Sequence, residues 1–138
     1  MVKEDLICLA LKARKESYSP YSCFRVGAAL LADDGRIFTG CNVENAAYSP
    51  TNCAERTAFF KAVSEGARHF KAIAICGGND SDGSLSWCYP CGVCRQVMAE
   101  FCDPESFEII IARSEAESET YLLKELLPKS FGPSTSSL

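Results

Sequence analysis

Two cysteine clusters in this chain carry residue types that can hold a metal ion and move a proton beside it. The first is Cys53-Ala54-Glu55-Arg56, and the second is Pro90-Cys91-Gly92-Val93-Cys94. They offer three thiolates and a carboxylate, Glu55, that need not be a ligand. A structural zinc usually takes four protein ligands, whereas a catalytic zinc takes three and keeps its fourth position for water or substrate. The pattern therefore favours one catalytic zinc per chain. Its predicted ligands are Cys53, Cys91 and Cys94.

Both clusters lie where helices are predicted to begin. Free backbone N–H groups and the positive end of the helix dipole favour a thiolate over a thiol at that place. Three thiolates and Zn²⁺ still sum to a negative charge, which disfavours ionisation of a bound water. We expect Arg56, next to the first cluster, to offset part of this charge by donating to the sulfur atoms, without touching substrate.

Other kinds of site fit parts of the same pattern. A fourth cysteine, either Cys41 or Cys88, would make the zinc structural. A thioredoxin-like redox pair would need its CxxC after the first strand, and here the pair follows a third strand and a long loop. The one histidine, His69, has no motif neighbours and is expected at the surface, so a Cys-His or Ser-His-Asp enzyme is improbable.

Helical and strand patterns alternate along the chain. Helices are predicted over 3–17, 53–65, 91–101 and 123–127, and strands over 24–32, 36–43, 70–76, 107–112 and 119–122. This alternation is typical of an α/β layered fold with a mixed sheet. With 138 residues, the chain is expected to form one domain over 1–131, followed by a flexible tail over 132–138.

Charge and cysteine content limit the function classes. The net charge is −4 and no basic run occurs, so nucleic acid is a poor partner. No apolar run is long enough to span a membrane, and the N-terminal residues do not resemble a signal peptide. The nine cysteines then indicate a cytoplasmic protein with free thiols. The six cysteines outside the clusters are expected to be mostly small buried hydrophobes.

Further motifs accompany the clusters in one order, and together they resemble the zinc-dependent cytidine deaminases of the small homotetrameric type. The similarity covers residues 5–131, and a cysteine as first ligand separates this type from the polynucleotide and deoxycytidylate deaminases, which carry histidine there. The additional motifs are Tyr18-Ser19-Pro20-Tyr21-Ser22, Phe24 to Leu30, Gly40 to Ala46, Gln96 after the second cluster, and Glu125-Leu126-Leu127-Pro128.

The resemblance implies hydrolytic deamination of cytidine and 2′-deoxycytidine to uridine and 2′-deoxyuridine, with release of ammonia, as a step of pyrimidine salvage. It implies a three-layer fold with a five-stranded mixed sheet flanked by helices, and a homotetramer with active sites at subunit interfaces. Glu55 would be the acid and base. Residues implied to bind substrate are Phe24 stacking on the base, Asn42 and Glu44 on the ribose, the Ala54 backbone on the base carbonyl, and Ala46 and Tyr48 along the pocket.

Alternatives remain open at this point. A related small-molecule deaminase, such as one acting on blasticidin S, would share the clusters, and so would a non-enzymatic zinc-binding module. Asn42 and Glu44 argue for a ribose. Tyr89 departs from the small residue that many relatives carry before the proline, which leaves fine substrate preference open. Apolar Phe59, Phe60 and Val63 favour oligomerisation, and Phe131 could pack against a neighbouring subunit.

Overall fold

The computed structural model describes residues 3–81 and 83–133. The helices are α1 (Lys3–Arg14), α2 (Ala54–Ser64), α3 (Gly92–Phe101) and α4 (Leu123–Leu126). The strands are β1 (Phe24–Ala32), β2 (Ile37–Cys41), β3 (Phe70–Asn79), β4 (Glu108–Ala112) and β5 (Ser118–Leu122). Every predicted element is present. No helix among these residues is long and apolar enough to cross a membrane.

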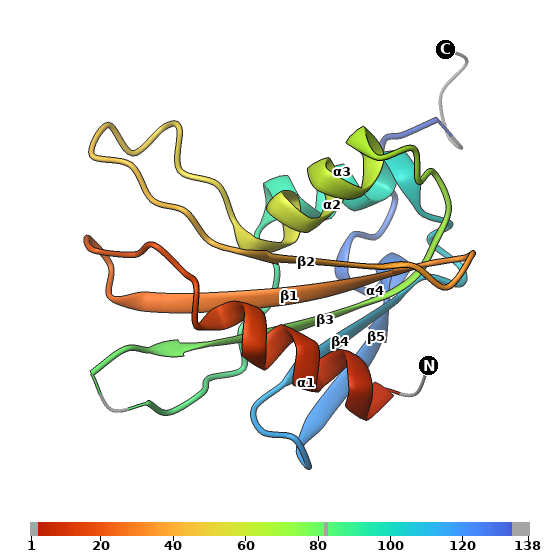
Figure 1. Cartoon of the computed structure of the whole chain (residues 1–138). Coiled ribbons are helices and arrows are strands. Elements are labelled where there is room, and N and C mark those ends of the chain that lie inside the picture. The colour runs from red at the N-terminus through yellow and green to blue at the C-terminus, as the bar shows by residue number, and fades with distance from the viewer. Residues whose placement is uncertain (1–2, 82, 134–138) are drawn as a thin grey trace.

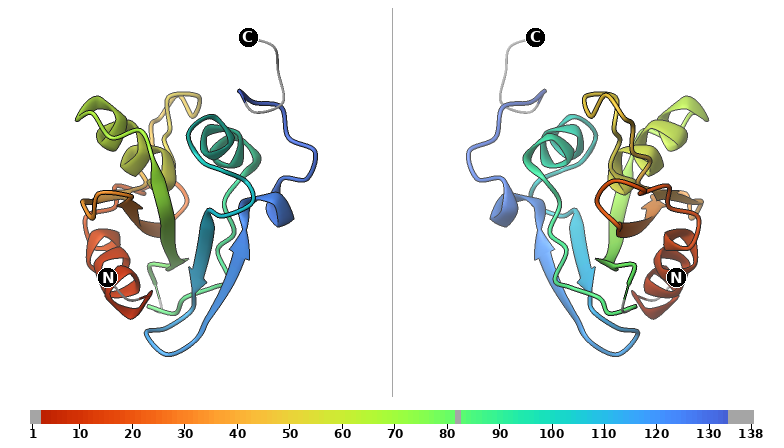
Figure 2. Two further views of the ribbon diagram at one scale, coloured as in Figure 1. Left: turned by 90° about the vertical axis from the view of Figure 1, so that its right-hand side faces the viewer. Right: turned by 90° about the vertical axis from the view of Figure 1, so that its left-hand side faces the viewer.

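The strands form one mixed sheet in the order β2-β1-β3-β4-β5. β3 and β4 are parallel, and the other neighbouring pairs are antiparallel. Figures 1 and 2 show α1 on one face of this sheet and α2 and α3 on the other. The predicted α/β fold with three layers and a five-stranded mixed sheet is confirmed.

Side chains of the central strands alternate between two cores, as the period of a β-strand requires. Ile73, Ile75 and Ile109 pack in the larger core, beneath α2 and α3. Ala74 and Ile110, one residue along in each strand, pack in the smaller core beneath α1. Because both faces of these strands are covered, their sequences are continuously apolar.

Strand β3 is longer than predicted. The apolar run ends at Cys76, but the strand continues through Gly77 and Gly78 because Asn79 still pairs with Phe24 at the start of β1. A Cβ atom on Gly77 would lie 2.7 Å from the Cys88 sulfur and 3.0 Å from the Phe24 ring. The glycine therefore leaves room for two side chains that line the cavity described below.

Helix α2 packs very closely on β2, which fixes where the helix begins. A Cβ atom on Gly40 would lie 2.6 Å from the Ala54 carbonyl oxygen and 2.6 Å from the Ala58 backbone nitrogen. Any larger residue at position 40 would push the first turn of α2 away from the sheet. The first cysteine cluster occupies that turn, so its position depends on this contact.

Two expectations about apolar residues need correction. Of the six cysteines outside the clusters only Cys76 and Cys102 are buried, while Cys8 and Cys23 are exposed because they lie on the outer side of α1 and in a turn. Phe59, one of the three apolar residues of α2 that favoured oligomerisation, is fully buried in the larger core, whereas its neighbour Phe60 is exposed. Of the predicted tail, residues 134–138 lie outside the described residues.

Candidate active site

Three sulfur atoms converge where α2 and α3 begin. Cys53 occupies the N-cap position of α2, and Cys91 occupies that of α3. The Cys91 sulfur lies 3.8 Å from the Cys53 sulfur and 3.5 Å from that of Cys94, which is one turn into α3. The Cys91 sulfur also accepts a hydrogen bond from the Cys94 backbone N–H. The two helix dipoles therefore point their positive ends at the same cluster.

The cluster has the dimensions of a zinc site. With a Zn–S bond of about 2.3 Å, tetrahedral geometry puts ligand sulfurs about 3.8 Å apart. The three sulfurs all lie within 4.8 Å of one another, and no fourth His, Cys, Asp or Glu of residues 3–81 and 83–133 joins the group. The donor set thus fits Zn²⁺ with three protein ligands, which is the predicted set of Cys53, Cys91 and Cys94.

Charge around the cluster stabilises a thiolate. The Arg56 Nη2 group donates to the Cys53 sulfur at 3.2 Å. A hydrogen bond from the Cys94 thiol, with the Arg56 guanidinium, holds the pKa of Cys53 well below its usual range. The same shared proton raises the pKa of Cys94. A zinc ion bound here would replace that proton, because metal ligation requires thiolates.

Glu55 is a buried carboxylate beside the cluster. Its residue is 4% exposed, and it follows Cys53 by two positions in the first turn of α2. Burial, together with the charge of Cys53, raises the pKa of Glu55 to about 7, although hydrogen bonding to its own backbone N–H and the Arg56 charge oppose the shift. A carboxyl group with such a pKa can both accept and release a proton near neutral pH.

One cavity of about 300 Å³ opens onto these groups. Seven of the predicted site residues take part in lining it, namely Phe24, Asn42, Glu44, Cys53, Ala54, Glu55 and Cys91. Cys94 and Arg56 lie behind this lining and touch the Cys53 and Cys91 sulfurs. The structure therefore brings residues from β1, from the segment after β2 and from both helix starts to one space.

Asn42 and Glu44 reach the cavity already held in place by hydrogen bonds. The Asn42 side-chain oxygen accepts from the Val26 backbone N–H at 2.9 Å, and its amide donates to the Phe24 carbonyl at 2.8 Å. The Glu44 carboxylate accepts from the Ser22 hydroxyl and from the backbone N–H groups of Tyr21 and Ser22. Burial raises the pKa of Glu44, but these hydrogen bonds outweigh that effect and lower it.

Two predicted residues do not reach this cavity within one chain. Ala46 is absent from its lining, and Tyr48 lines a neighbouring hollow instead and is 73% exposed. Other residues do line the cavity without having been predicted as substrate-binding, such as Ser22, Thr51 and Asn52. Ser22 belongs to a motif that carries the resemblance, but its bond to Glu44, 22 residues away, left no local signal.

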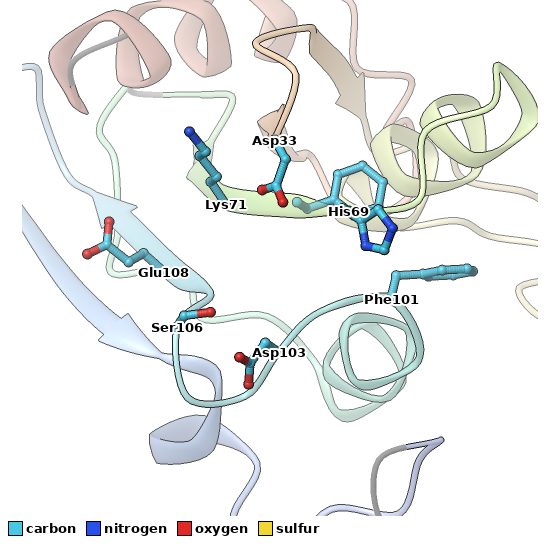
Figure 3. A pocket seen from close by; sticks show the side chains of 8 residues that line it. Asp33, His69, Lys71, Phe101, Asp103, Ser106 and Glu108 are labelled. Atoms are coloured by element: carbon cyan, nitrogen blue, oxygen red, sulfur yellow. The ribbon is translucent and has the colours of Figure 1, made fainter.

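A second hollow lies at the opposite end of β3. It is lined by Asp33, His69, Lys71 and Phe101, among others, and Figure 3 shows acidic and basic side chains spaced around it. Among the described residues, the group of three side chains that could hold a metal ion lies at the cysteine cluster and not in this second hollow. His69 is exposed, as predicted.

A cluster of three cysteine sulfurs, a buried carboxylate and a cavity of small-molecule size define a zinc-dependent hydrolytic site. Comparison with known families agrees with this class. The sequence model of the family described as "Cytidine and deoxycytidylate deaminase zinc-binding region" matches residues 1–108. The chain belongs to this family.

Individual relatives are similar over most of their length. The cytidine deaminase of Sporosarcina psychrophila is 54% identical over 128 residues, which are 93% of this chain and 90% of the relative. The crystal structure of the cytidine deaminase from Burkholderia pseudomallei has a TM-score of 0.84 and 44% identity, covering 95% of this chain and 100% of that one. The crystal structure of the cytidine deaminase from Mycobacterium tuberculosis has a TM-score of 0.80 and 40% identity, covering 96% of this chain and 99% of that one.

The contact between Arg56 and Cys53 predicts that Arg56→Gln will weaken zinc retention without removing any ligand. Loss of a partner that bonds a metal ligand typically costs about 10–100-fold in affinity, and a loss of that size is expected here. Zinc affinity should be measured by competition with a chromogenic chelator. Arg56→Lys keeps the charge and is expected to lie between wild type and Arg56→Gln. Equal affinity in wild type and Arg56→Gln would contradict this role.

Proposed function

We propose that the protein hydrolyses cytidine and 2′-deoxycytidine to uridine and 2′-deoxyuridine and releases ammonia, as a step of pyrimidine salvage. The observation that carries this proposal is one shared cavity. It joins the sulfur cluster and Glu55, which can perform the hydrolysis, to Asn42 and Glu44, which can bind a ribose. Membership in the cytidine deaminase family supports the same reaction.

Cys53, Cys91 and Cys94 would hold one zinc ion. When bound, zinc supplies a Lewis acid that lowers the pKa of a water molecule at the open coordination position. The two helix N-termini and the Arg56 guanidinium reduce the excess negative charge of three thiolates. Without this compensation the cluster would disfavour ionisation of the water.

Glu55 acts as the acid and base of the reaction. It accepts a proton from the attacking water, whose oxygen forms a bond to C4 of the pyrimidine, and it delivers a proton to N3. It then takes the remaining proton from the new C4 hydroxyl and transfers it to the exocyclic amine, so that the C4–N bond breaks with ammonia as the leaving group and the C4 carbonyl of the uridine product forms. Its buried position and a pKa near 7 suit a group that must change protonation state in each step.

The other cavity residues bind and orient the nucleoside. The Phe24 ring stacks on the base, and the Ala54 backbone N–H donates to the base carbonyl. Glu44 accepts from a ribose hydroxyl, while Asn42 uses the amide hydrogen that its bond to Phe24 leaves over. We expect Ala46 and Tyr48 to line the pocket of a neighbouring subunit.

A homotetramer with active sites at subunit contacts would bring Ala46 and Tyr48 of one subunit to the pocket of its neighbour. Tyr21 and Tyr48 form an edge-to-face ring pair beside the cavity and are 49% and 73% exposed. Tyr18 and Val43, which pair in an isolated β-bridge, are 55% and 45% exposed. Exposed apolar side chains that gather beside a site are typical of an interface.

We further propose that residues 1–131 act as one catalytic domain in the cytoplasm. None of the nine cysteines forms a disulfide, which suits a reducing compartment.

Glu55→Gln is expected to keep zinc and lose activity. The change removes the proton acceptor but preserves the shape of the side chain, so kcat for cytidine should fall by roughly 10²–10⁴-fold. The readout is the loss of cytidine absorbance in the ultraviolet, with zinc quantified on the same sample. Glu65→Gln, an exposed acid just after the same helix, serves as control and should match wild type. A Glu55→Gln enzyme with near-normal kcat would overturn the assignment.

The assembly has its own test in solution. Light scattering coupled to gel filtration should give a mass of four chains of 15.0 kDa. A monomeric mass at assay concentration would contradict the tetramer and would leave Ala46 and Tyr48 without a role in the pocket.

Blasticidin S in the same ultraviolet assay should be a poorer substrate than cytidine, because it offers no ribose hydroxyls to Asn42 and Glu44.

A further inference from the structure

Tyr89 is tied to the edge strand of the sheet by a shared hydrogen-bond acceptor. Its hydroxyl donates to Oε1 of Glu119 at 2.8 Å, and the Tyr121 hydroxyl donates to the same oxygen at 2.8 Å. The two tyrosine rings also meet edge to face, with centroids 6.1 Å apart. Hydrogen bonds to a carboxylate are among the stronger ones in proteins, so this arrangement holds the Tyr89 ring in one orientation.

The sheet register explains why Glu119 and Tyr121 act together. They are two residues apart on β5 and lie opposite Ile111 and Ile109 of β4. Cross-strand partners project to the same face, and those two isoleucines belong to the core beneath α2 and α3. Glu119 and Tyr121 therefore project towards the layer in which α3 begins, where Tyr89 lies.

The segment that carries Tyr89 is also fixed at other points. Ser86 pairs with Gly77 at the end of β3, with its backbone N–H 2.7 Å from the Gly77 carbonyl. The Arg113 guanidinium lies over the Trp87 ring at 5.0 Å. Contacts with β3 and with the turn after β4 therefore fix the backbone around residues 86–89, and Tyr89 at its end lines the cavity.

Tyr89 lines the cavity beside Cys88 and Cys91 and keeps 44% of its surface exposed, so it lies at the rim. Tyr89 comes two residues before Cys91, so it belongs to the same segment of the cavity wall as this predicted metal ligand. Asn42 and Glu44 belong to a different segment, which follows β2. A nucleoside with its ribose on Asn42 and Glu44 and its C4 at the sulfurs would therefore have its amine end on the side of the cavity that Cys91 and Tyr89 line.

We propose that Tyr89 is a specificity-determining residue that limits substituents at C5 and on the exocyclic amine of the pyrimidine, and that Glu119 and Tyr121 are positioning residues acting through it. The inference rests on the proposed deamination and extends it to which substrates fit. Tyr89 carries out no proton transfer; it sets how much room the base has at its reacting end.

The test compares substrates within each variant. Shortening the wall with Tyr89→Ser should raise kcat/KM for 5-methylcytidine and N4-methylcytidine relative to cytidine by about tenfold, the usual effect of one methyl group in a tight pocket. The gain should come mainly from a lower KM for the methylated substrates. The ratio for 2′-deoxycytidine to cytidine should stay constant, because the ribose lies at the other end of the cavity.

The positioning role of Glu119 and Tyr121 is tested by separate variants. Glu119→Ala and Tyr121→Phe should shift the methylated-substrate ratios in the same direction as Tyr89→Ser, but less. Adding Glu119→Ala to Tyr89→Ser should give no further shift, as expected for residues that act through one side chain. Glu100→Ala, an exposed acid at the far end of α3, is the matched control and should leave every ratio at the wild-type value.

The outcomes separate this inference from the proposed function. A wild-type enzyme without cytidine turnover would contradict the deamination itself. Normal cytidine turnover with unchanged methylated-substrate ratios in Tyr89→Ser would overturn the role of Tyr89 alone. Should Tyr89→Ser fail to fold or lose zinc, Tyr121→Phe and Glu119→Ala carry the test, and unchanged ratios in both would overturn the inference.

Discussion

The convergence of two helix N-termini on three sulfur atoms is the constraint on which the rest of the site depends. Like-charged thiolates repel one another, so the cluster needs the helix dipoles and the Arg56 guanidinium as well as a metal. The close contact between Gly40 and Ala54 sets the position of the first helix on the sheet. The same turn of α2 places Glu55 inside the cavity, so this packing contact positions both Cys53 and the carboxylate, while Cys91 and Cys94 come from the start of α3.

The chemistry of the site could be predicted from local sequence because its parts are close together in the chain. Cys53, Glu55 and Arg56 fall within one helical turn, and Cys91 and Cys94 within another. Spacing of this kind determines geometry directly, since a helix start presents its first residues towards one point. The alternation of helical and strand patterns likewise predicted each element, with errors at the ends, as at β3.

What sequence could not supply depends on contacts between distant segments. The bond from Ser22 to Glu44, and the shared acceptor that joins Tyr89 to Tyr121, link residues 22 and more positions apart and leave no local pattern. Burial of single residues was equally hard to predict: Phe59 and Phe60 are neighbours of one type, yet the helical phase buries one and exposes the other. Tyr89 stood out in the sequence, but its tether to β5 became visible only in the fold.

The central claim is that zinc has three sulfur ligands and one open position, and X-ray absorption spectroscopy at the zinc edge tests it most directly. The account predicts three sulfur scatterers at about 2.3 Å and one oxygen scatterer at about 2.0 Å. Cys88→Ser should leave that spectrum unchanged, because Cys88 lines the cavity without belonging to the sulfur group. Four sulfur scatterers in the wild-type protein, reduced to three in Cys88→Ser, would show a closed structural site and contradict the account.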